Sequence, residues 1–119
     1  MPVVADFITF SDVSFDLELG GTSSQTLNEN ITEQPRLGEG ALLLWNVRRE
    51  GTGSVSYNIR VNNGNARSFT VSETNWHSVH EVIQTNDLNQ GDNNIFITVT
   101  GGTGRLSVGD VTILYRLDS

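Results

Sequence analysis

The chain has 119 residues, no cysteine and a formal net charge of −7, with a pI near 4.5. This length suits a single domain over residues 1–119, and a domain of this size can bury one sizeable core. Without cysteine there can be no disulfide, thiolate zinc site or cysteine nucleophile. The acidic balance argues against nucleic acid as a partner, because phosphate binding needs a basic surface.

The N-terminal residues 1–6 have neither the basic start nor the apolar core of a signal peptide. No apolar run approaches the length of a membrane span. We therefore expect no membrane insertion, and a chain that is either cytoplasmic or exported by a non-classical route.

The first third of the chain predicts two strands and a weakly patterned segment. Residues 3–10 are apolar and β-prone, and residues 13–19 alternate apolar with polar side chains, which predicts a half-buried strand. Residues 22–40 are polar, and we interpret them as a surface loop or a short edge strand around 26–31, with a binding segment as the alternative. The alternating residues of the second strand are Val13, Phe15, Leu17 and Leu19.

The middle of the chain predicts a buried strand followed by a hairpin. Residues 41–47 are almost continuously apolar, which favours a strand buried on both faces in the middle of a sheet, with Trp45 in the core. Residues 55–61 alternate in polarity, and residues 69–71 resume the pattern after an Asn-Gly pair at 63–64. Asn-Gly between alternating runs is the strongest short-range signal of a hairpin.

The last third predicts three more strands. Residues 76–83 and 94–100 are β-prone, and Leu88 is the large apolar residue of the polar loop between them, so we expect it to reach the core. The final strand, residues 106–117, changes the phase of its alternation at Gly109-Asp110, which predicts a β-bulge. Short strands throughout and no helical pattern indicate an all-β fold, and we predict an antiparallel β-sandwich of jelly-roll type.

Residues 42–117 carry an ordered series of motifs: V-N-N-G, Trp76, Leu88-x-x-Gly91, Asn94-Ile95-x-Ile97, G-G-T-G and Leu106-x-Val108-x-Asp110-Val111. This order resembles the jelly-roll carbohydrate-binding modules of the galactose-binding-like type. The resemblance implies a non-catalytic, lectin-like domain with carbohydrate as its partner. It speaks to fold more directly than to ligand, because one fold hosts many functions.

The resemblance also implies candidate sugar-binding residues. In that family, sugars stack on aromatic side chains in loops at one end of the sandwich, while Asn or Arg bonds their hydroxyls. The corresponding candidates here are Trp76, His77, Thr103 and Arg105, and Val79 stands where a second aromatic is common. The alternative for Trp76 is that it covers the core beneath the 85–93 loop.

Many members of that family hold a structural calcium, using N-terminal carboxylates and an Asp near the closing strand. The resemblance therefore implies a calcium site made by Asp6, Asp12 and Asp110, whose hard oxygen ligands suit this ion. His77 and His80 are three residues apart on a predicted strand, so they point to opposite faces and cannot jointly chelate a metal.

Two other classes of function compete with sugar binding. An enzyme has little support, because no serine lies in a nucleophile motif and no two acids are placed to face each other across a cleft. A structural module of an oligomeric or fibre-like particle is the stronger alternative, with a homo-oligomer as the expected state. Both functions can coexist, because oligomerisation raises the avidity of weak sugar sites.

Overall fold

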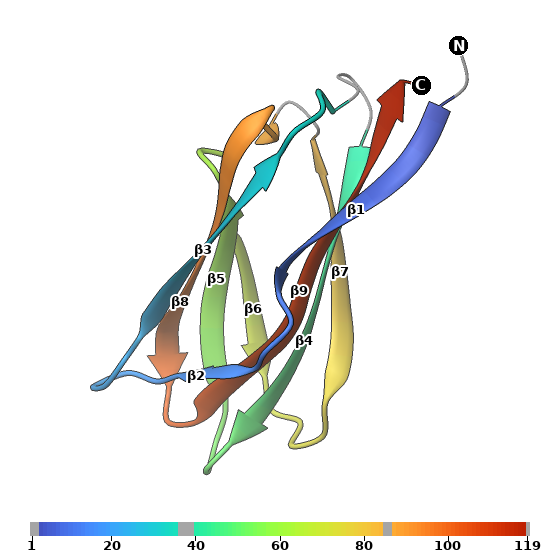
Figure 1. Ribbon diagram of the computed structural model, residues 1–119. Helices are drawn as coiled ribbons and strands as arrows, with labels where there is room; N and C mark the ends of the chain where they lie inside the picture. Colours follow the sequence, from blue (N-terminus) through green and yellow to red (C-terminus); the bar gives the residue numbers. More distant parts are fainter. Residues whose placement is uncertain (1–2, 36–39, 85–86, 119) are drawn as a thin grey trace.

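In the computed structural model, residues 3–35, 40–84 and 87–118 are described, and they form two antiparallel sheets with no helix (Figure 1). The strands are β1 (Val3–Ser11), β2 (Phe15–Leu17), β3 (Ser24–Ile31), β4 (Gly40–Glu50), β5 (Val55–Val61), β6 (Arg67–Val71), β7 (His77–Gln84), β8 (Gly91–Gly102) and β9 (Arg105–Asp118).

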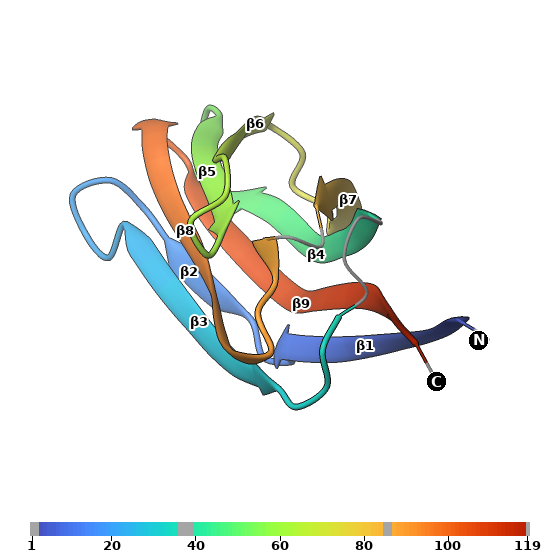
Figure 2. The ribbon, with the colours of Figure 1, turned by 90° about the horizontal axis from the view of Figure 1, so that it is seen from above.

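The two sheets lie face to face as the layers of a sandwich (Figure 2). Sheet A has the order β1-β9-β4-β7, and β2 also pairs with β9. Sheet B has the order β3-β8-β5-β6. Strands distant in the sequence are therefore neighbours, and the predicted antiparallel jelly-roll sandwich is confirmed.

The core fills the space between the sheets and contains an aromatic contact that joins them. Trp45 of β4 and Tyr57 of β5 are each only 1% exposed, and the indole Nε1–H donates a hydrogen bond of 2.9 Å to the Tyr57 hydroxyl. Phe69 packs on both rings, with centroid distances of 5.3 Å and 5.6 Å. Burial raises the pKa of Tyr57 to about 12. The predicted core position of Trp45 is confirmed.

Several other local predictions are confirmed. The Asn-Gly hairpin joins β5 to β6, and the expected edge strand is β3. Leu88 is 3% exposed and reaches the core from its loop. That loop is held by the buried Asn93, whose amide bonds the backbone of Asn89 and Gly91.

Two predictions about burial are wrong. In residues 13–19 only Phe15–Leu17 is a strand, and Val13 and Leu19 are 68% and 48% exposed, because β9 supplies just three partners to this segment. In β4, only alternate residues are buried. Leu42 and Leu44 are half-buried on the outer face, because no described element covers sheet A on that side.

The molecule is elongated, with principal extents of 51 × 23 × 22 Å. The N-terminal end of β1 and the C-terminal end of β9 lie side by side at one end of the sandwich (Figures 1 and 2). Across the described ranges, no helix has the length and hydropathy needed to cross a membrane.

Candidate functional site

An irregularity in β9 interrupts the outer face of sheet A. Leu44 pairs with Thr112 but Asn46 pairs with Gly109, so β9 carries one residue more than β4 over this span. Asp110 accommodates the extra residue with a φ of 52°, a conformation that Asp tolerates better than most residues. The β-bulge predicted at Gly109-Asp110 is confirmed.

The same position coincides with a gap along the edge of the sheet. β1 pairs with β9 up to Ser11, and β2 resumes the pairing at Phe15, so residues 12–14 have no partner on β9. Bulge and gap together leave a cavity of about 290 Å³, which we call the Trp76 notch. It is lined by Asp12, Ser14, Asn46, Trp76, Gly109 and Asp110.

Trp76 forms the aromatic wall of the notch. It precedes β7 and is 43% exposed. The Arg48 guanidinium lies 4.8 Å from the centre of its ring, which covers one face of the indole. Gly109 has no side chain here, and a Cβ at that position would stand 3.7 Å from the indole Cη2. The indole therefore lies close to the sheet, with part of its surface open to the notch.

A chain of hydrogen-bonded polar side chains from three strands ends in the notch, which Asn46 and Asp110 line. The Ser78 hydroxyl donates to the Asn46 amide oxygen at 2.7 Å, and the Asn46 Nδ2 donates to Asp110 Oδ2 at 3.0 Å. These two bonds fix the orientation of the Asn46 amide and of the Asp110 carboxylate. Fixed polar groups beside an aromatic surface are the usual makeup of a small-molecule site.

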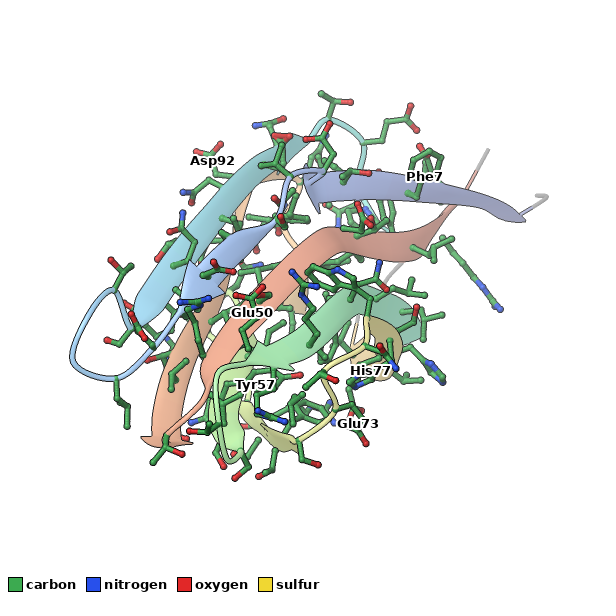
Figure 3. All side chains as sticks on the ribbon, turned by 90° about the horizontal axis from the view of Figure 1, so that it is seen from below. Phe7, Glu50, Tyr57, Glu73, His77 and Asp92 are labelled. Carbon is green, nitrogen blue, oxygen red and sulfur yellow. The ribbon has the colours of Figure 1, made fainter. Side chains whose placement is uncertain are left out.

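A charged network continues from Trp76 along the outer face. Arg48 donates to Glu50 at 2.6 Å, and Glu50 also accepts a hydrogen bond from Arg105. Figure 3 shows Glu50 between β4 and β9. The hydrogen bond from Arg105, with the charges of both arginines, lowers the pKa of the Glu50 carboxyl. Arg105 also lies 3.8 Å from Asp16, so the network is close to neutral.

The structure brings together only part of the predicted sugar site. Trp76 lines the notch and does not cover the core. His77 lies opposite the buried Val47 and so belongs to the inner side of sheet A. Thr103 lies in the turn between β8 and β9, where its hydroxyl donates to the Thr52 carbonyl. Arg105 is connected to Trp76 only through Glu50 and Arg48.

The acids predicted to hold calcium are also divided. Asp12 and Asp110 line the notch, whereas Asp6 lies on β1 opposite Tyr115 and accepts from the Phe7 N–H. In the parts of the chain that the structure describes, no three His, Cys, Asp or Glu side chains converge. Calcium takes six to eight oxygen ligands, and only two of the three predicted carboxylates meet in the notch. These side chains alone do not fit a resident calcium site, and calcium stays a prediction.

Three residues that line the notch were not predicted as site residues from the sequence: Ser14, Asn46 and Gly109. For two of them, the sequence contains a feature that could have identified them. Asn46 interrupts the apolar run of residues 41–47 at a position that alternation places on the outer face. Gly109 lies at the phase change of the final strand, where a missing side chain leaves room for a neighbour. No local pattern distinguishes Ser14 from an ordinary loop serine.

No protein-family model and no curated protein sequence matches this chain, but solved structures do. Dimeric latent PorU from Porphyromonas gingivalis matches with a TM-score of 0.71 at 9% identity, over 99% of this chain and 13% of that one. A family 35 carbohydrate-binding module from Clostridium thermocellum matches with a TM-score of 0.53 at 17% identity, over 95% and 98%. A chain of the T13 IBDV viral particle matches with a TM-score of 0.52 at 16% identity, over 96% and 35%.

These likenesses show the fold. The chain has the jelly-roll sandwich of carbohydrate-binding modules, as the sequence motifs imply, and it spans nearly the whole length of the family 35 module. It spans only 13% of the PorU chain and 35% of the viral chain.

Proposed function

We propose that this chain is a non-catalytic carbohydrate-binding domain and that the Trp76 notch is its sugar site. The observation that carries the proposal is an open cavity on a sheet face, lined by a half-exposed Trp and by polar groups that hydrogen bonds orient. Aromatic faces pack against the C–H face of a sugar ring, and amide, hydroxyl and carboxylate groups bond its hydroxyls.

The rest of the site supports a ligand of this size and chemistry. A volume of about 290 Å³ is near the lower limit of small-molecule pockets, which suits one or two sugar units. Ser14, Asn46 and Asp110 come from different segments but face one space. The likeness in fold to a carbohydrate-binding module adds support of a weaker kind, because one fold hosts many functions.

Replacing Trp76 with alanine should weaken sugar binding by about thirtyfold or more, the effect of removing about 2 kcal/mol at a binding hot spot. Trp76→Phe keeps a ring and should retain part of the affinity. Isothermal titration calorimetry, with a sugar identified by screening, measures the affinity of both variants. Leu19→Ala is the matched control, because Leu19 is also large, apolar and 48% exposed. Unchanged affinity in a folded Trp76→Ala protein would remove the notch as the site.

Two carboxylates in one cavity also raise the question of glycoside cleavage. Asp12 and Asp110 both line the notch, and Asp110 accepts a hydrogen bond from the Asn46 amide, which favours its ionised form as an acceptor rather than as a proton donor. We therefore place both as ligand-binding groups. Release of reducing sugar from the bound oligosaccharide would contradict the non-catalytic assignment.

A second candidate function is self-assembly, and one observation favours it. Four apolar residues form a row across the outer face of sheet A, because Phe7 lies opposite Leu114, Leu114 opposite Leu42, and Leu42 opposite Val82. Phe7, labelled in Figure 3, and Val82 are 63% and 59% exposed. A continuous exposed apolar strip is typical of an interaction surface. The viral-particle chain of similar fold lends support to this candidate.

If the apolar row pairs with a second copy, the average mass in solution should rise toward a dimer with concentration. Val82→Asp should then keep the protein monomeric, because it places a charge in the row. Val13→Asp is the matched control, since Val13 is 68% exposed and lies outside the row. Light scattering measures the mass of all three proteins. A monomeric wild-type protein at high concentration would remove this candidate.

A further inference from the structure

The Trp76 notch is an acidic cavity. Two of its lining residues, Asp12 and Asp110, are exposed carboxylic acids. Among the described residues, neither is paired with an arginine, and the hydrogen bond that Asp110 accepts comes from the neutral Asn46 amide. A ligand that enters the notch therefore meets two carboxylates that no cation of the described chain neutralises.

The cation nearest the notch is already committed elsewhere. Arg48 stacks on the Trp76 ring at 4.8 Å and donates to Glu50 at 2.6 Å. Glu50 in turn also bonds Arg105, which lies 3.8 Å from Asp16, so Arg48 and Arg105 are matched by two acids of their own. The whole chain adds a net charge of −7, which has the same sign as the notch. No arginine or lysine is among the residues that line the notch.

We infer that the Trp76 notch selects glycans with a free protonated amine, such as oligosaccharides of non-acetylated glucosamine, over neutral glycans, and that it rejects uronic and sialic acids. This inference rests on the proposed sugar site. An ammonium on a ring seated against Trp76 would lie within reach of both carboxylates and of the aromatic surface, which itself attracts cations. A carboxylate at the same place on the ligand would meet two like charges.

A matched panel of ligands tests the inference. Oligosaccharides of glucosamine, of N-acetylglucosamine and of a glucuronic-acid polymer are titrated into the full chain at low and at high salt. At low salt the free amine should gain about fivefold in affinity for each carboxylate within roughly 4 Å. The gain should shrink at high salt, because salt screens exposed charges. The glucuronic-acid ligand should bind weakest.

Charge-removing variants locate the effect. Asp12→Asn and Asp110→Asn keep the shape of each side chain, and Asn tolerates the φ of 52° at position 110. Each should lower the ratio of glucosamine to N-acetylglucosamine affinity by about fivefold at low salt. The controls are Glu29→Gln and Glu33→Gln, which remove the same charge from exposed positions on or beside β3. They should leave that ratio unchanged.

The outcomes separate this inference from the proposed function. Equal affinity for the amine and its acetylated form, or a ratio that does not change in Asp12→Asn and Asp110→Asn, would overturn the inference while sugar binding stands. Preference for the glucuronic-acid ligand that disappears with a chelator would also overturn it, in favour of a calcium bridge. No binding to any ligand of this panel or of a broad glycan array would remove both.

Discussion

Replacing Trp45 with alanine should lower the free energy of unfolding by about 3–5 kcal/mol, among the largest effects available to a single substitution in this chain. Trp45 is 1% exposed, contacts Phe69 edge-on and joins the two sheets through its bond to Tyr57. Its removal leaves a cavity and an unpaired hydroxyl between the layers. Most domains are stable by only 5–15 kcal/mol, so the loss should be plain in denaturant unfolding followed by circular dichroism.

Tyr57→Phe separates the hydrogen bond from the packing. It removes one oxygen and leaves the indole N–H of Trp45 buried without a partner, which costs about 1–3 kcal/mol. Above pH 10, the free energy of unfolding of Tyr57→Phe should also fall less steeply with pH than that of the wild-type protein. Because the pKa of Tyr57 is raised from 10.0 to about 12, its contribution is intact below pH 10 and declines as the pH rises toward 12. A loss below 1 kcal/mol in Trp45→Ala would contradict the central place of this contact.

Replacing Gly102 with alanine should cost about 2–5 kcal/mol, because the site forbids a side chain in two ways. Gly102 has a φ of 93°, and a Cβ there would lie 2.1 Å from the Ser54 carbonyl oxygen and 2.9 Å from the Val55 Cα. Both obstacles are backbone atoms, so β5 itself would have to move away from the end of β8. The melting temperature and the denaturant midpoint measure the loss.

Gly20 and Gly51 are matched controls for this substitution. They have φ values of 85° and 79°, but a Cβ at either position would have nothing within 4 Å. Gly20→Ala and Gly51→Ala should therefore show only the cost of a left-handed backbone, about 1–2 kcal/mol. If all three alanine variants are equally stable, the close approach of β8 and β5 is not what Gly102 provides.

The fold was predictable because most of its strands have one buried and one exposed face. Alternation in residues 55–61 and 94–100 places Tyr57 and Ile97 inside. In residues 106–117 the change of phase in the alternation predicts the bulge at Gly109-Asp110. Exposure of the second face could not be predicted for residues 41–47. Their apolar run reads as burial on both sides, but Leu42 and Leu44 face outward on a sheet that no described element covers.

The candidate site was predictable only in part, because it is built by pairing between distant strands. Trp76 stood out by residue type, and Asp12 and Asp110 by a resemblance that implied a metal. That these three share one cavity with Asn46 depends on the register of β4 against β9 and on the gap between β1 and β2. Neither this register nor this gap can be read from the spacing of residues in the sequence. His77 was chosen because it follows Trp76 in the sequence, and Thr103 because the resemblance implies a polar side chain in the closing turn. The strand pairing separates both residues from the notch.

A glycan array probed with the labelled wild-type protein and with Trp76→Ala, with and without chelator, tests the central claim most directly. We expect the wild-type protein to bind a defined set of glycans, the variant to lose that binding while keeping its circular dichroism spectrum, and the chelator to leave it unchanged. A folded wild-type protein that binds nothing on the array, or a Trp76→Ala protein that binds the same glycans equally well, would contradict a sugar site in the Trp76 notch.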